Sequence, residues 1–168
     1  ELFPGDARTS TKKVWQFDPD PTAPKQNVHA YNSNRREGPS NIYSFPMVYQ
    51  DRLYFTAGGD LWWGKNEASM FCIDPKLNGD VTTTAKLWSY PLVKHSMSSV
   101  AIVDGLAYVA DCGRMLHCVD MKSGKALWTH EAKGDFWASP MIADGKVYIG
   151  SRRGEFFIFE ANRDKRQL

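Results

Sequence analysis

Side chains that could carry chemistry lie in four short segments of the second half of the sequence. His95, Asp111 and Asp135 combine an imidazole with carboxylates, the groups that proteins use for proton transfer and for metal binding. Arg152 and Arg153 form an adjacent guanidinium pair that could bind an oxyanion through parallel hydrogen bonds. These residues predict acid–base, metal or anion-binding chemistry, with a solvated turn as the more ordinary interpretation of the arginine pair.

Aromatic side chains supply a second set of candidates. Trp62 and Trp63 are adjacent in the glycine-rich segment Gly58–Glu67, where both cannot enter one core. At least one is therefore expected at the surface or against a ligand, with packing over the edge of a sheet as the alternative. Trp137 and Arg114 are further candidates, and packing is the favoured interpretation of Trp137.

Standard catalytic motifs are missing from the sequence. It contains no GxSxG, HExxH, P-loop or CxxC motif, and no GxGxxG follows a strand. The sequence therefore assigns no catalytic residue and no metal ligand. Of the three cysteines, Cys72 is expected to be buried, and Cys112 lies in a turn and is the one thiol expected to be exposed.

Composition and charge restrict the class of protein. The chain has 168 residues, of which 42% are hydrophobic and 24% charged, as in one ordinary globular domain or part of a larger one. Its net charge of +2 is too small for a field that would attract nucleic acid, so no nucleic-acid partner is expected. The apolar stretches are far shorter than the roughly 20 residues of a membrane span, so no transmembrane segment is expected.

An internal repeat determines how the candidates are positioned. Ser139–Gly150 aligns with Ser99–Ala110 at an offset of 40 without a gap, and Phe45–Phe55 aligns at an offset of 54. Each copy consists of short apolar runs, and two of the three copies have an Asp-Gly pair between the first two runs, a strong signal for a β-hairpin. No segment shows a convincing helical period. The repeat predicts an all-β array of meanders.

The end of each repeat carries a motif. In the best preserved copy Asp120, Ser123-Gly124 and Trp128 follow one another, and Asp74 and Trp88 are their counterparts one copy earlier. This pattern resembles the tryptophan-docking motif of the PQQ-like β-propellers, where PQQ is pyrroloquinoline quinone. That family includes quinoprotein dehydrogenases and non-catalytic relatives such as the outer-membrane assembly lipoprotein. The resemblance implies that each tryptophan packs against the neighbouring blade.

The resemblance implies four-stranded antiparallel blades, about three of which form an open arc of a larger ring of about 6–8 blades. Residues 1–40 are expected to hold the closing strand of a preceding blade, at Val14–Phe17, and a proline-rich connector. Residues 41–90 form a blade with decorated loops, 91–130 a blade with the full motif, and 131–168 a blade with an eroded motif that ends in Leu168 instead of tryptophan. The remaining blades of the ring are expected partners.

Blade topology sorts the candidates onto two faces. Loops before the first strand and between the second and third strands share one face, which we call the first face, and the other turns share the second face. The second face receives tight turns, and no site is expected there. The first face receives all the candidate ligand-binding residues, namely Trp62, Trp63, His95, Asp111, Arg114, Asp135, Trp137, Arg152 and Arg153.

Three functions remain open. The first is a non-catalytic propeller that binds or scaffolds a protein, small molecule or glycan on the first face. The second is part of a PQQ-dependent alcohol or sugar dehydrogenase, with PQQ stacked on Trp137, Trp62 or Trp63 and with Asp111 or Asp135 as the base beside calcium. The third is a carbohydrate-binding propeller that uses Trp62 and Trp63 as a stacking platform.

The first of these hypotheses is preferred, and whether the chain is part of an enzyme is left open. No cofactor is assigned with it; PQQ with calcium belongs to the second hypothesis. Members of the resembled family are largely exported, so the resemblance implies a location in the bacterial periplasm or cell envelope.

Overall fold

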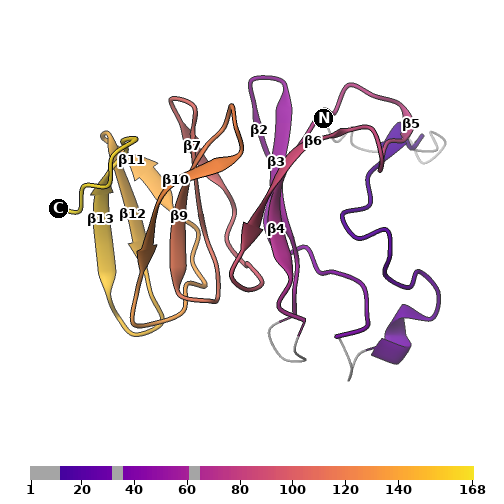
Figure 1. The fold of residues 1–168 in the computed structure, drawn as a ribbon, viewed down its shortest axis with the longest axis horizontal. Coiled ribbons are helices and arrows are strands. Elements are labelled where there is room, and N and C mark those ends of the chain that lie inside the picture. Colours follow the sequence, from indigo (N-terminus) through magenta and orange to yellow (C-terminus); the bar gives the residue numbers. More distant parts are fainter. Residues whose placement is uncertain (1–11, 32–35, 61–64) are drawn as a thin grey trace, which may run out of the picture.

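A computed structural model describes residues 12–31, 36–60 and 65–168 of the chain. Three antiparallel sheets stand side by side in an arc, and an irregular N-terminal segment lies beyond the first sheet (Figure 1). The first sheet, blade 1, has the order β2-β3-β4-β6; blade 2 has β7-β8-β9-β10 and blade 3 has β11-β12-β13. The elements are β1 (Trp15–Gln16), a 3-10 helix (Val28–Tyr31), β2 (Met47–Tyr49), β3 (Arg52–Gly58), β4 (Ala68–Ile73), β5 (Gly79–Asp80), β6 (Lys86–Leu92), β7 (Ala101–Val103), β8 (Leu106–Ala110), β9 (Met115–Asp120), β10 (Lys125–Glu131), β11 (Met141–Ala143), β12 (Lys146–Gly150) and β13 (Phe156–Glu160).

This architecture confirms the predicted all-β arc of propeller blades. The hairpins form where the Asp-Gly pairs predict them, because both residues of a type I′ turn need a positive φ. Asp104 and Gly105 have φ of 47° and 75°, and Asp144 and Gly145 have φ of 48° and 66°. In the described residues, no helix has the length and apolar character needed to cross a membrane.

Blade 3 has three assigned strands, and the end of the chain lies in the position of its fourth. The Glu160 amide donates to the Arg166 carbonyl at 2.9 Å, and the Leu168 amide donates to the Ile158 carbonyl at 2.9 Å. Leu168 is 62% exposed. The residue that aligns with the docking tryptophan of the other blades therefore contributes little to the core.

Apolar side chains fill the spaces between neighbouring blades. Tyr108 and Trp128 of blade 2 pack with Phe159 of blade 3 in one cluster, and a second cluster joins blades 1 and 2. The indole Nε1 of Trp88 donates to the carbonyl of Met121 at 3.1 Å, and the indole Nε1 of Trp128 donates to the carbonyl of Asn162 at 3.1 Å. Each indole thus bonds to the blade that follows it in the chain.

Gly124 lies directly against the first of these indoles. A Cβ atom at Gly124 would lie 2.7 Å from the Trp88 ring, and its φ is 67°. Glycine is therefore required here both for the close approach and for the left-handed backbone.

The N-terminal segment covers the outer side of blade 1. Strand β1 pairs in parallel with β5, which belongs to the long turn between β4 and β6. Phe17 packs edge-on against Phe55 and Phe71, with ring centroids 6.0 and 5.9 Å apart. Strand β1 thus pairs with the decorated turn of blade 1, and Phe17 packs on the sheet of that blade. The assignment of Val14–Phe17 to a preceding blade stays a prediction.

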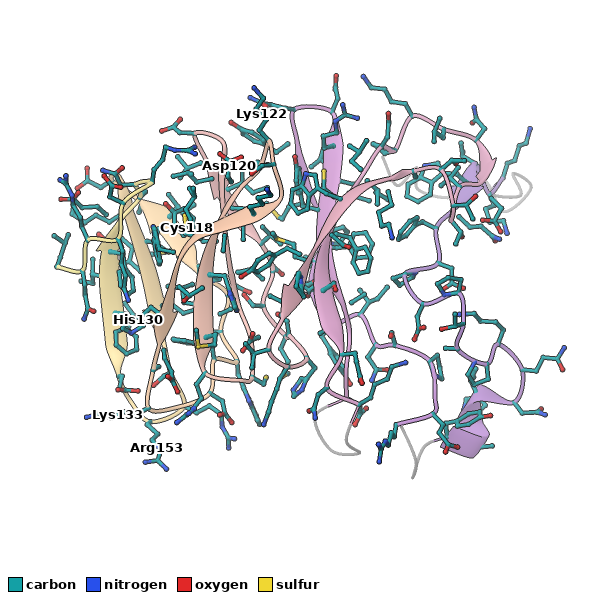
Figure 2. All side chains as sticks on the ribbon, viewed as in Figure 1. Cys118, Asp120, Lys122, His130, Lys133 and Arg153 are labelled. Atoms are coloured by element: carbon teal, nitrogen blue, oxygen red, sulfur yellow. The ribbon has the colours of Figure 1, made fainter. Side chains whose placement is uncertain are left out.

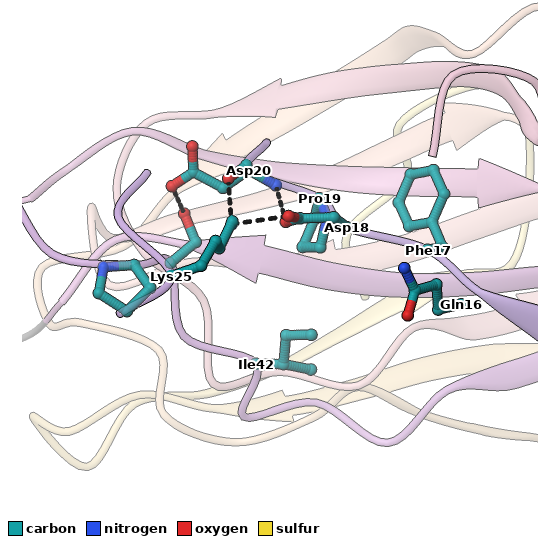
Figure 3. Close-up of a pocket in the computed structure, with 9 residues that line it drawn as sticks. Gln16, Phe17, Asp18, Pro19, Asp20, Lys25 and Ile42 are labelled. Carbon is teal, nitrogen blue, oxygen red and sulfur yellow. Dashed lines mark hydrogen bonds and ion pairs between the residues drawn. The ribbon is translucent and has the colours of Figure 1, made fainter. Parts of the chain in front are cut away.

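A pocket of 450 Å³ separates this segment from the start of blade 1 (Figure 3). Lys25 forms an ion pair with Asp18 at 2.7 Å, and Ser40 donates to the Asp20 carboxylate at 2.7 Å. Lys65 of blade 1 also forms an ion pair with Asp20. The charged groups around the pocket are thus paired with one another, and they fasten the connector to blade 1.

All three cysteines are buried and free. The predicted burial of Cys72 is confirmed, with 2% exposure. The predicted exposure of Cys112 is wrong, because blade packing covers its turn: the side chain is 4% exposed and its Sγ lies 3.5 Å from the Phe136 carbonyl oxygen. Burial raises the pKa of the Cys112 thiol to about 12.

Candidate functional site

The first face of the arc is the edge that carries the β8–β9 and β12–β13 loops, opposite the β2–β3 and β7–β8 turns (Figure 1). Serine hydroxyls link the innermost strands near this face. The Phe45 amide donates to Ser99 Oγ at 2.9 Å, and the Ser99 amide donates to Ser139 Oγ at 2.9 Å. Successive blades are therefore held in register where their first strands begin.

Asp111 is a buried structural acceptor on the β8–β9 loop, with 0% exposure. Its Oδ1 accepts from the amides of Gly113 and Met115 at 2.7 and 3.4 Å. Its Oδ2 accepts from the Val93 amide at 2.9 Å and lies 2.9 Å from His117 Nε2. Four donors thus surround the carboxylate, which joins its own loop to the connection between blades 1 and 2.

His117 extends this network to the outer strand of blade 1. Because a carboxylate only accepts, Nε2 of His117 donates to Asp111, and Nδ1 of the same ring forms a hydrogen bond of 3.0 Å with the Tyr90 hydroxyl. His117 is 2% exposed, so this is a polar bridge inside the packed interface. Burial and the nearby Asp111 raise the pKa of Tyr90.

His95 lies in the interior at the same interface, with 3% exposure. Gly59 lies against it, because a Cβ atom at Gly59 would lie 2.1 Å from the Cβ of His95. Neither ring nitrogen has a hydrogen-bond partner among the described residues. Burial lowers the pKa of His95, and the carboxylates of Asp60 and Asp111 oppose that shift.

An open pocket of 400 Å³ lies on the first face between blades 2 and 3. The loop after β10 and the β12–β13 loop meet there, since the Arg152 amide donates to the Asp135 carbonyl at 2.9 Å. A Cβ atom at Gly134 would lie 2.8 Å from the amide nitrogen of Arg153, so the close approach requires glycine. We call this the cation pocket; its lining residues are Arg114, Lys133, Gly134, Asp135, Arg152 and Arg153.

Two of the cations on the pocket wall have partners. Arg114 pairs with Glu131, and Arg152 lies 3.8 Å from the Asp135 carboxylate. The Arg152 guanidinium also stacks over the Trp137 ring, 3.8 Å from its centroid. Trp137 Nε1 is buried and has no acceptor in the part of the chain that the structure describes.

The structure brings four of the nine candidates, Arg114, Asp135, Arg152 and Arg153, into this pocket and places Trp137 against it. It places His95 and Asp111 in the interior between blades 1 and 2. Trp62 and Trp63 lie outside the described residues.

Sequence reasoning missed Lys133, which contributes an ammonium group to the pocket. Its position two residues after the fourth strand of blade 2 was a usable signal, because that strand ends on the first face.

The second face also carries a hollow. A groove of 720 Å³ runs between blades 1 and 2, where turns without a site were expected. Its walls include Trp88, Lys122 and Arg163, and Arg163 forms an ion pair with Asp120 at 2.8 Å. The groove is the outer side of the tryptophan-docking contact.

The stacked antiparallel sheets and the contacts between them define an arc of a β-propeller. Residues 76–167 match the family model described as outer membrane protein assembly factor BamB. This match covers more than half of the chain, and the chain belongs to that family.

Two curated relatives differ in function. Over 93 residues, the chain is 30% identical to 1-butanol dehydrogenase (cytochrome c) of Thauera butanivorans, covering 48% of this chain and 14% of the relative. Over 117 residues, it is 23% identical to outer membrane protein assembly factor BamB of Legionella pneumophila, covering 69% of this chain and 27% of the relative. The chain thus spans less than a third of either relative.

Solved structures support the fold. The chain superposes on quinohemoprotein alcohol dehydrogenase ADHIIG of Pseudomonas putida HK5 with a TM-score of 0.56 at 16% identity, covering 86% of this chain and 23% of that one. The superposition on BamB of Moraxella catarrhalis has a TM-score of 0.50 at 16% identity, covering 77% and 36%.

Asp111 and Trp137 do not fit the roles of base and stacking platform for PQQ with calcium. The Asp111 carboxylate is buried and surrounded by four donors, and one face of the Trp137 ring is covered by Arg152. In residues 12–31, 36–60 and 65–168, no group of three His, Cys, Asp or Glu side chains is arranged to hold a metal ion. No chemical step is therefore assigned through this cofactor.

Proposed function

We propose that this chain is part of a non-catalytic PQQ-type propeller that binds a protein partner through its first face. The observation that carries the proposal is that some candidate residues are buried between blades and others are exposed on the first face. Asp111 and His95, which could have done acid–base chemistry, are buried in the interface between blades. The charged residues of the cation pocket instead stay at the surface, where a partner can reach them.

The relatives support a protein partner and a location in the periplasm or cell envelope. The name of the Legionella pneumophila relative describes an assembly factor for outer membrane proteins. A propeller arc suits such a role because its blades hold loops from distant parts of the chain on one rigid face. We propose that residues 1–40 hold the closing strand of a preceding blade and a connector, and that residues 41–90, 91–130 and 131–168 each form one blade. Each blade then places one set of loops on the first face.

Site-specific photo-crosslinking tests the proposal. Benzoylphenylalanine replaces Ala138, an exposed residue of the first face, and in a matched control it replaces Gln50, an exposed residue of the second face. Irradiation in the native cells is expected to join the Ala138 variant to a discrete protein and to leave the Gln50 variant uncrosslinked. Equal crosslinking from both positions, or none from Ala138, would contradict a first-face binding role.

A second candidate is a quinoprotein alcohol dehydrogenase, favoured by the 30% identity to 1-butanol dehydrogenase. It requires PQQ to bind the complete ring and alcohol to be oxidised there. A glycan platform at Trp62 and Trp63 is a third candidate; unchanged sugar binding after alanine replacement of both residues would remove it.

A further inference from the structure

The cation pocket carries more positive charge than its own walls neutralise. Arg114 and Arg152 have the partners described above, Glu131 and Asp135. The side chains of Lys133 and Arg153 form no ion pair with any residue that the structure describes, and both are exposed. Figure 2 shows the two side chains near one another at the first-face end of blades 2 and 3, and both line the same pocket.

We propose that the cation pocket binds carboxylates on an acidic segment of a partner protein, with Lys133 and Arg153 as the cations that contact it. This inference rests on the proposed function, because it names the chemistry by which the first face would recognise its partner. The segment is extended and exposed, with neighbouring Asp or Glu side chains that reach the two cations together.

The loops of the pocket already bind carboxylates of this chain. Glu155 accepts hydrogen bonds from the amides of Lys133 and Gly134 at 3.1 and 3.2 Å and from the Ser151 hydroxyl at 2.9 Å. This binding holds the two loops together. Against the effect of its desolvation, the hydrogen bonds from Ser151, Gly134 and Lys133, together with the charge of Lys133, lower the pKa of Glu155. The planar guanidinium of Arg153 suits a carboxylate, which it can bind through two parallel hydrogen bonds.

The charge of the pocket favours a protein segment over a polyphosphate. The carboxylates of Glu131, Asp135 and Glu155 lie beside Lys133 and Arg153 and would repel a densely charged backbone. The net charge of the whole chain is only +2, so no wider field compensates for that repulsion. A few carboxylates spaced along a peptide can meet Lys133 and Arg153 without approaching the three acids.

The test uses the full chain and a fluorescent peptide that carries two neighbouring glutamates among neutral residues, with the matching glutamine peptide as the uncharged probe. Binding is followed by fluorescence anisotropy at low salt for the unmodified chain and for the double variant Lys133→Ala/Arg153→Ala. The control double variant, Lys122→Ala/Lys125→Ala, removes the same charge from exposed residues of the second-face turn. The unfolding midpoints of all three proteins show that they remain folded.

The pocket variant is expected to bind the glutamate peptide at least about tenfold more weakly, whereas the control variant keeps its affinity. The inference is overturned if the unmodified chain binds neither peptide, binds both equally, or loses affinity equally in the two variants. Displacement of the peptide by inorganic phosphate at equal concentration would instead assign the pocket to phosphate. First-face crosslinks without peptide binding would overturn the acidic-segment assignment alone, and peptide binding without such crosslinks would overturn the proposed function.

Discussion

Trp128 offers the sharpest test of how the blades are held together. Its side chain is 8% exposed, its ring lies 5.4 Å from that of Phe159 and 5.8 Å from that of Tyr108, and its Nε1 donates to the Asn162 carbonyl. Removing a buried indole costs about 3–5 kcal/mol, because apolar contacts are lost and a cavity remains. Trp128→Ala is therefore expected to lower the free energy of unfolding by about that amount.

Trp128→Phe separates packing from hydrogen bonding. This variant keeps most of the ring contact but loses the hydrogen bond to Asn162. Loss of that bond should lower the free energy of unfolding by about 1 kcal/mol, and the smaller ring should lower it further. Trp137→Ala is the matched control, because Trp137 is only partly buried and contacts Arg152 on one face.

The assay is urea denaturation of the full chain followed by far-UV circular dichroism, since tryptophan fluorescence changes with the substitution itself. The expected order of midpoints is unmodified chain, Trp137→Ala, Trp128→Phe and Trp128→Ala, from highest to lowest. Equal midpoints for Trp128→Ala and Trp137→Ala would refute the role of Trp128 in joining blades 2 and 3.

Three further perturbations have distinct outcomes. Hydrogen bonds from the Ser123 amide and from Arg163 lower the pKa of Asp120 from 3.8 to about 2. Asp120→Asn should therefore lower the free energy of unfolding near neutral pH. The difference in free energy of unfolding between the variant and the unmodified chain should shrink as pH falls from 3.8 to about 2. A difference that does not change with pH would contradict this prediction. Burial lowers the pKa of His95 below 6.5, so stability should fall as pH drops below 6.5, where the unfolded chain takes up the proton first; an NMR midpoint for His95 at or above 6.5 would contradict this. Gly134→Ala should separate the two loops of the cation pocket, and an unchanged amide spectrum for Arg153 would show that the close approach is not required.

Much of the fold could be predicted from the sequence because it repeats locally. Asp104-Gly105 and Asp144-Gly145 mark hairpins by a backbone requirement that acts within two residues. The positions of Trp88 and Trp128 could be aligned because the strands around them repeat, although the segment from Asp74 to Trp88 is longer than the one from Asp120 to Trp128. The pairing of β1 with β5 could not, since a parallel pair of two-residue strands leaves no periodic pattern.

The site was less accessible to prediction, because its geometry depends on contacts between blades. The turn position of Cys112 predicted an exposed thiol, but the backbone at Phe136, which follows the last strand of blade 2, covers it. The bridge from Asp111 through His117 to Tyr90 joins two blades and has no signature in either repeat. By contrast, the position of Arg152 and Arg153 beside Asp135 could be expected, because blade topology places the loops that carry them on the same face.

The central proposal is that the protein containing this chain binds a protein partner instead of oxidising alcohols. The most direct measurement adds PQQ and calcium to the complete gene product that contains this chain, and follows tryptophan fluorescence together with dye-linked oxidation of 1-butanol. We expect no saturable change in fluorescence and no dye reduction above background. Saturable binding accompanied by turnover would contradict it and establish a quinoprotein dehydrogenase.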